Sequence, residues 1–268
     1  MTDIMIGGVE ATRPKSERFT SLIWGPSGMG KTTLASTMPG KIALINFDPD
    51  GPSSIADAEN VEVFDLSGSS MSIVERMKGE DPLGIKKSLE HFDSYIIDSL
   101  TTIAERTLAH GIKITKGATI ERPSPGAYGA RNAIVVELVR NVLAITAPLK
   151  RNVAFIAHEA APTTNDDGAI LDITLALGGQ LPQNVSLRIN EVWCMYETSK
   201  NEKMIIIRKA RMRSPVKSRM FSAMKSPEFE WHWNAEDRND PTNMWIKDWY
   251  AEWEQNGYKK LPLPSLKK

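Results

Sequence analysis

The chain has 268 residues, of which 41% are hydrophobic and 25% are charged. This composition is typical of a globular domain with a sizeable core, and it excludes wholesale disorder, a collagen-like repeat and a disulfide scaffold. The 33 Lys and Arg residues balance the 33 Asp and Glu residues, so binding to nucleic acid or to a membrane would require charges segregated on the surface.

The single cysteine, Cys194, rules out an internal disulfide and a Cys-based zinc site. Its strand-like surroundings predict a buried side chain. The first residues do not form a basic segment followed by an apolar one, as a signal peptide would. No apolar run approaches the roughly 20 residues that span a bilayer. We therefore expect a cytoplasmic protein with no membrane partner.

Strands alternate with helices up to about residue 160, which predicts a mostly parallel α/β sheet flanked by helices. Apolar runs predict strands at 19–24, 41–47, 61–66, 94–98 and 152–157. Periodic segments predict helices at 32–38, 71–91 (broken near residue 81), 100–109 and 130–147. Two segments with little periodicity predict long loops, at 111–128, which also holds three Gly and two Pro, and at 159–184.

The later residues predict an antiparallel hairpin extension, with strands at 187–197 and 203–211. A further helix is expected at 242–255, where Trp245, Trp249 and Trp253 share one face by their spacing. We expect that face to pack on the protein's own core.

The predicted elements divide the chain into three parts. Residues 1–18 form a polar tail or interface arm, and residues 19–225 form the core domain. Residues 226–268 form a Trp-rich, acidic C-terminal helix and tail.

The segment GPSGMGKTT, residues 25–33, follows the first strand directly and fits the phosphate-loop pattern G-x-x-x-x-G-K-[ST]. Its glycines let backbone N–H groups converge on phosphate oxygens, and the next helix adds its positive N-terminus. Lys31 is expected to reach the β- and γ-phosphates, and Thr32 to bind Mg²⁺. The predicted nucleotide-binding residues are Gly25, Pro26, Ser27, Gly28, Met29, Gly30, Lys31, Thr32 and Thr33.

Two further segments supply carboxylates. YIIDS, residues 95–99, ends a buried-type strand in Asp98, which suits a second metal ligand. FDPDG follows the second strand and holds Asp48 and Asp50. Its D-x-x-G spacing also occurs in GTPases, but its place in the chain is wrong and no N-K-x-D motif is present. We expect Asp50, or Asp48, to act as a general base, with a simple turn as the alternative.

The ordered segments GPSGMGKTT, FDPD, YIIDS, FIAHE and LGGQLPQNVSLRINEVW resemble the RecA-like ATPase core over residues 19–215. The resemblance is strongest to the compact bacteriophage ATPases associated with single-strand-annealing recombination. It implies a RecA-like P-loop NTPase fold with ATP and Mg²⁺ as cofactors. It also implies that Lys31, Thr32 and Asp98 contact phosphate and metal. Asp50 stands where those proteins carry a catalytic Glu, and His158 where they carry a Gln that senses the γ-phosphate.

The resemblance also implies partners. Lys209 and Arg211 stand where RecA filaments present two cations to the neighbouring subunit's ATP, which implies self-association into a ring or filament. The loop at 159–177 and the stretch at 124–131 resemble the two DNA-binding regions of the family, which implies single-stranded DNA as a partner. The polymerisation domain and the large C-terminal domain of the recombinases are not evident in the sequence, which leaves independent filament formation open.

Charge is segregated along the chain in one place. Residues 200–219 hold eight cations against one acid: Lys200, Lys203, Arg208, Lys209, Arg211, Arg213, Lys217 and Arg219 against Glu202. This cluster favours contact with DNA phosphates or with a neighbour's ATP, and the sequence does not divide the two. The acidic C-terminal part argues against DNA there and leaves a single-strand-binding or annealing protein as a further partner.

We therefore expect a Mg²⁺-dependent, phage-encoded ATPase that acts with single-stranded DNA in recombination or annealing. One alternative is a P-loop kinase, against which the lack of an Arg-rich lid argues. The other is a non-catalytic, ATP-gated interaction or assembly protein. It is favoured by Asp50 and His158, which stand in place of the family's Glu and Gln.

Overall fold

The computed structural model describes residues 5–6, 9–10, 18–49, 51–69 and 72–265. Its strands are β1 (Met5–Ile6), β2 (Val9–Glu10), β3 (Thr20–Gly25), β4 (Ile42–Asn46), β5 (Val61–Asp65), β6 (Ser94–Asp98), β7 (Asn152–His158), β8 (Thr163–Thr164), β9 (Ile170–Asp172), β10 (Glu191–Glu197), β11 (Lys203–Ile206) and β12 (Glu228–Glu230). Its α-helices are α1 (Lys31–Ala35), α2 (Ile73–Arg76), α3 (Leu100–Ile114), α4 (Pro125–Thr146), α5 (Leu181–Ser186) and α6 (Ile246–Gln255). Two 3₁₀ helices are η1 (Gly51–Ile55) and η2 (Pro82–Ser88).

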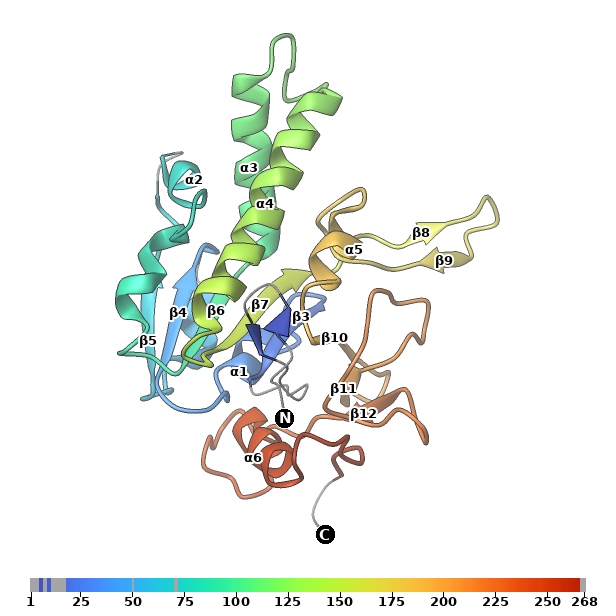
Figure 1. The fold of residues 1–268 in the computed structure, drawn as a ribbon. Coiled ribbons are helices and arrows are strands. Elements are labelled where there is room, and N and C mark those ends of the chain that lie inside the picture. The colour runs from blue at the N-terminus through green and yellow to red at the C-terminus, as the bar shows by residue number, and fades with distance from the viewer. Residues whose placement is uncertain (1–4, 7–8, 11–17, 50, 70–71, 266–268) are drawn as a thin grey trace.

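A central sheet organises the domain, with the strand order β12-β11-β10-β3-β7-β6-β4-β5 (Figure 1). The strands from β10 to β5 run parallel to their neighbours, whereas β11 pairs antiparallel with both β10 and β12. The predicted fold class is confirmed: a mostly parallel α/β sheet, flanked by helices, with an antiparallel extension.

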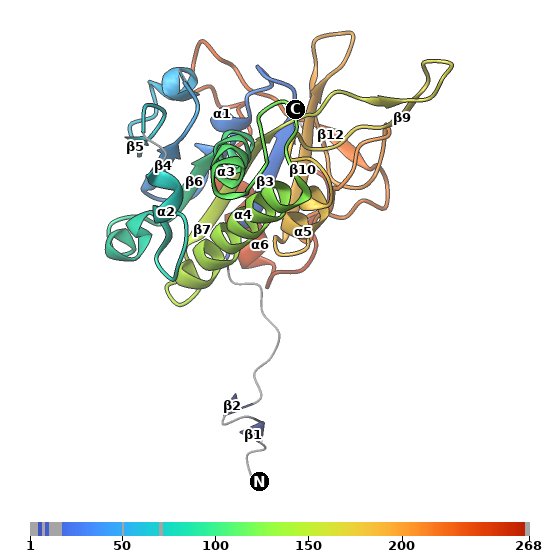
Figure 2. The ribbon, with the colours of Figure 1, turned by 90° about the horizontal axis from the view of Figure 1, so that it is seen from above.

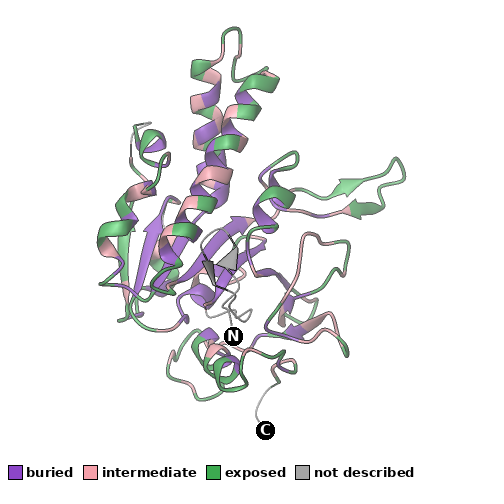
Figure 3. Cartoon of the chain, in the orientation of Figure 1, coloured by how far each residue is buried: buried purple, intermediate pink, exposed green. Residues whose placement is uncertain are grey.

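The sheet is covered on both faces. Successive side chains of β3 point to opposite faces, as in any strand, so Leu22 and Trp24 join one apolar core and Ile23 joins the other. The first core lies under α3 and α4, which lie in front of the strands in Figure 2. The second core lies under α1 and α6. The central strands are therefore buried throughout, while β5 at the edge is largely exposed (Figure 3).

The aromatic face of α6 packs on the protein's own core, as predicted. The Trp249 ring lies 6.1 Å from that of Trp193 in β10 and 5.5 Å from that of Phe221. Trp253 is also buried. Trp245 is the residue that precedes α6 and is half-buried. The helix therefore starts later than expected, after a turn in which Asp240 accepts hydrogen bonds from the backbone N–H and the hydroxyl of Thr242.

The loop predicted at 111–128 is shorter than expected, because α3 continues to Ile114 and α4 begins at Pro125. Ser124 caps α4 by accepting a hydrogen bond from the N–H of Ala127, and Pro125 fits the first helical turn. Gly111 reflects a close approach of the two helices: a Cβ there would lie 2.5 Å from the carbonyl oxygen of Ala127. The glycine that suggested a loop is thus a packing residue.

The segment predicted as a loop at 159–184 also contains regular structure. It forms the β8–β9 hairpin, which extends away from the domain, and then the first residues of α5 (Figure 1). The predicted strand at 187–197 therefore begins only at Glu191, in β10. Cys194 is fully buried in β10, as expected. Within the described residues, none of the helices has the length and apolar character that a membrane crossing requires.

Candidate active site

Four parallel strands end at one edge of the sheet and bring the predicted site residues together. Gly25 at the end of β3 is in register with His158 at the end of β7. Asn46 at the end of β4 is in register with Asp98 at the end of β6. Ligand sites of open parallel sheets form at such carboxyl ends.

The phosphate loop joins β3 to α1. A Cβ at Gly25 would lie 2.1 Å from the carbonyl oxygen of Met195, so only glycine fits there. Gly30 has φ +86°, a left-handed conformation that glycine adopts without strain. The Lys31 ammonium donates hydrogen bonds to the carbonyl oxygens of Gly25 (3.1 Å) and Pro26 (2.6 Å). Burial lowers the pKa of Lys31, and the charges of Asp98 and Asp48 act against this effect.

Thr32 and Asp98 form the second part of the site. The Thr32 hydroxyl donates a hydrogen bond of 2.6 Å to Oδ2 of Asp98. Asp98 is 3% exposed, and burial raises its pKa to about 6, against the hydrogen bond from Thr32. A hydroxyl and a carboxylate are hard oxygen donors of the type that Mg²⁺ prefers. These two residues therefore fit a Mg²⁺ ion, whose charge would compensate the buried carboxylate.

Asp48 and His158 meet at the same edge of the sheet. His158 Nε2 lies 3.1 Å from Oδ2 of Asp48, and Ser99 and Thr102 donate hydroxyl hydrogen bonds to Oδ1 of Asp48. Burial raises the pKa of Asp48, but these three hydrogen bonds outweigh it and hold the pKa below its ordinary value. Asp48 is therefore ionised at neutral pH. Asp50, the other candidate base, lies outside the described residues.

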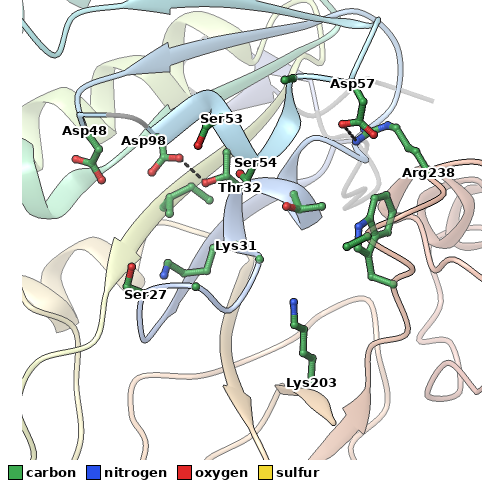
Figure 4. A pocket seen from close by; sticks show the side chains of 18 of the residues that line it. Ser27, Lys31, Thr32, Asp48, Ser53, Ser54, Asp57, Asp98, Lys203 and Arg238 are labelled. Atoms are coloured by element: carbon green, nitrogen blue, oxygen red, sulfur yellow. Dashed lines mark hydrogen bonds and ion pairs between the residues drawn. The ribbon is translucent and has the colours of Figure 1, made fainter. Parts of the chain in front are cut away.

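The phosphate loop, Asp48, Asp98 and His158 line one end of a cavity of about 1040 Å³. The opposite end is lined by Asp57, in the turn after η1, and by residues of the C-terminal part, whereas Ser53 and Ser54 of η1 lie beside Asp98 and Thr32 (Figure 4). The cavity-lining residues that the sequence patterns did not indicate include Ser53, Ser54, Asp57, Lys203, Trp231, Trp233 and Arg238. Ser53, Ser54 and Asp57 follow the FDPDG segment closely, whereas Lys203, Trp231, Trp233 and Arg238 come from segments far from the phosphate loop in sequence.

Lys209 and Arg211 do not line this cavity. Lys209 is exposed, and Arg211 forms a bidentate ion pair with Glu228, with 2.7 Å between Nη2 and Oε1. Their predicted role toward a neighbouring subunit's ATP stays a prediction. Arg213, from the same basic cluster, is paired with Glu159 at 2.9 Å. The cluster is thus partly neutralised within the chain.

The predicted DNA-binding loop at 159–177 differs in charge from the α3–α4 loop, which precedes the other predicted region at 124–131. The loop between α3 and α4 and its flanks carry Lys113, Lys116 and Arg122. The β8–β9 hairpin carries Asp166, Asp167 and Asp172, and the sequence has no Lys or Arg between 159 and 187. In the α4 stretch, Arg131 lies over the Tyr128 ring and donates a hydrogen bond to the Gly178 carbonyl oxygen, which ties the Gly178-Gly179 pair to α4.

Residues 17–228 match the family model of an AAA domain, and the chain belongs to this family. The match covers the phosphate loop, the Asp98 strand and the Asp48–His158 pair. The protein is therefore a P-loop ATPase domain of the AAA type.

Among solved structures, the chain is similar to the crystal structure of the RadB recombinase. The two share 14% sequence identity, with a TM-score of 0.43, over 73% of this chain and 84% of that one. No curated protein matches the chain.

Proposed function

We propose that this protein hydrolyses ATP in a Mg²⁺-dependent reaction. The observation that carries the proposal is the contact between Thr32 and Asp98 directly beside Lys31, with the ionised Asp48 in the same cavity. A phosphate loop alone would serve any phosphate ligand. A metal-binding pair and a carboxylate that can accept a proton are the additional parts that hydrolysis requires.

Each residue at the phosphate end of the cavity has its own role in this proposal. Lys31 leaves its two carbonyl partners and binds phosphate oxygens, together with the N–H groups of residues 28–32. Mg²⁺ held by Thr32 and Asp98 supplies positive charge to the phosphates. Asp48 orients a water molecule toward the γ-phosphate, and His158 keeps Asp48 ionised and in place. Asp50 stays a candidate for the same role.

We further propose that the ATPase is phage-encoded and acts with single-stranded DNA in recombination or annealing. The support is the segregation of cations at the tip of the α3–α4 hairpin and in residues 200–219 of a chain with no net charge. DNA would contact these surfaces rather than the acidic β8–β9 hairpin. Self-association would bring Lys209 and Arg211 to the ATP of a neighbouring subunit, and an annealing or single-strand-binding protein is a further partner.

Phosphate release from Mg²⁺-ATP, measured with and without single-stranded DNA at several salt concentrations, tests both the ATP hydrolysis and the action with DNA. If four cations contact phosphates, the logarithm of the DNA affinity should fall with the logarithm of salt concentration, with a slope of about −3. Hydrolysis that is indifferent to DNA would refute the DNA-dependent role. Binding of ATP without hydrolysis would favour the ATP-gated interaction protein instead.

A further inference from the structure

The cavity has two chemically different ends. At the first end, Lys31, Asp98 and Asp48 surround the place that the phosphate loop prepares for the β- and γ-phosphates. At the second end, Asp57 and Arg238 lie side by side, with 3.7 Å between Oδ1 of Asp57 and Nη1 of Arg238 (Figure 4). A nucleotide whose terminal phosphate points toward Asp48 must direct its nucleoside the other way. The second end is therefore where the sugar and base of a bound nucleotide would lie.

The second end is built on aromatic side chains that reach the phosphate loop. Trp231 is 2% exposed, and its Nε1 donates a hydrogen bond to the Met244 carbonyl oxygen. A Cβ at Gly30 would lie 3.0 Å from Cζ3 of Trp231, so the indole packs directly on the loop. The Trp233 ring stacks on Trp231, with centroids 5.7 Å apart and planes 20° apart. The wall is thus rigidly joined to the phosphate site.

Arg238 completes this wall. Its Nη2 donates hydrogen bonds to the carbonyl oxygen (3.3 Å) and hydroxyl (3.1 Å) of Ser36, just after α1. The guanidinium carbon lies 5.5 Å from the Trp233 ring centroid and 5.3 Å from that of Trp245. Nη1 is buried and has no hydrogen-bond acceptor among the described residues, although the Asp57 carboxylate lies 3.7 Å away. Nη1 is thus held by a long ion pair alone and makes no hydrogen bond within the described part of the chain, which is unusual for a buried donor.

We propose that Trp233 and Arg238 form a nucleobase-binding wall, which contacts the purine base of the nucleotide held by the phosphate loop. The inference rests on the proposed nucleotide binding and adds the part of the site that recognises the base. A purine offers a flat aromatic surface to pack against the indole and guanidinium planes, and ring nitrogens that accept hydrogen bonds from a guanidinium. Asp57, beside Arg238, accepts a hydrogen bond from a ring or exocyclic N–H.

A comparison of ATP with inorganic tripolyphosphate separates base contacts from phosphate contacts. Calorimetric titration of the full chain with each ligand, in the presence of Mg²⁺, should give at least tenfold tighter binding of ATP. In Trp233→Ala and Arg238→Ala, the affinity for ATP should fall at least tenfold, while the affinity for tripolyphosphate stays within twofold. Arg140→Ala, which removes an exposed arginine of α4 outside the cavity, is the matched control and should change neither.

The conservative variants Trp233→Phe and Arg238→Lys cover the case in which the alanine variants fail to fold. Phe keeps an aromatic face and should retain most of the ATP affinity, whereas Lys lacks the planar fork and should lose most of it. Tryptophan emission of the wild type should change on ATP binding and not on tripolyphosphate binding. Equal weakening of both ligands, or no weakening of either, would overturn the nucleobase wall. If the wild type bound neither ATP nor tripolyphosphate, the proposed function itself would be refuted.

Discussion

Replacing Asp98 by Asn should stabilise the nucleotide-free protein while it abolishes Mg²⁺-dependent ATP hydrolysis. Asp98 is 3% exposed, and its burial raises the pKa from 3.8 to about 6. Asn has nearly the same shape, carries no charge and can still accept the hydrogen bond that Thr32 donates. The substitution therefore removes a buried charge and keeps the local geometry.

The magnitude follows from linkage between protonation and folding. Because the pKa in the folded protein lies above that of the unfolded chain, the folded state binds the proton more tightly. The resulting stabilisation is complete below pH 3.8 and is lost as the pH rises through about 6. The pKa difference means that the ionisation of Asp98 lowers the free energy of unfolding by about 3 kcal/mol at pH 8 and by about half of that at pH 5.

Thermal unfolding of the nucleotide-free wild type and Asp98→Asn at pH 8 and pH 5 tests this reasoning. At pH 8 the variant should unfold at a temperature roughly 5–10 °C higher than the wild type. At pH 5 this difference in unfolding temperature should be about half as large. Asp166→Asn, which removes an exposed carboxylate at the tip of the β8–β9 hairpin, should unfold at the same temperature as the wild type at both pH values. The buried charge of Asp98 would not be the cause if Asp98→Asn were less stable than the wild type at pH 8, or if the difference in unfolding temperature did not change with pH.

Three further outcomes are expected. Lys31→Ala should abolish phosphate release from ATP, because the ammonium of Lys31 lies within the phosphate loop; unchanged release would contradict the assignment of the loop. Arg211→Ala should lower turnover by up to about 10³-fold without weakening ATP binding, as for cations that act on a neighbouring subunit's phosphate. Wild-type turnover per subunit that does not change with protein concentration, together with a fully active variant, would rule this role out. Trp249→Ala should destabilise the domain by about 3–5 kcal/mol in urea unfolding, since the ring packs on Trp193 and Phe221; a loss below 1 kcal/mol would show that the α6 face contributes little.

The order of strands and helices was largely predictable, because alternation of apolar residues and glycine or proline at element ends are local signals. The signals failed where a glycine serves packing instead of a turn. Gly111 suggested a loop but lies inside α3, where the neighbouring helix α4 comes too close for any side chain. Such a contact depends on a partner helix, and the sequence pattern of α3 alone does not contain it.

The phosphate end of the site can be recognised from the sequence alone. The backbone of a phosphate loop is shaped by consecutive residues, so GPSGMGKTT and the strand that ends in Asp98 are visible in the linear chain. The other end is formed only by folding, because Trp231 packs on Gly30, and Arg238 donates a hydrogen bond to Ser36, which lies 202 residues earlier in the chain. Folding also decides which cations of residues 200–219 are neutralised, because Arg211 and Arg213 meet Glu228 and Glu159 only once the sheet has formed. Contacts between distant segments depend on the packing of the whole domain, and no short motif records them.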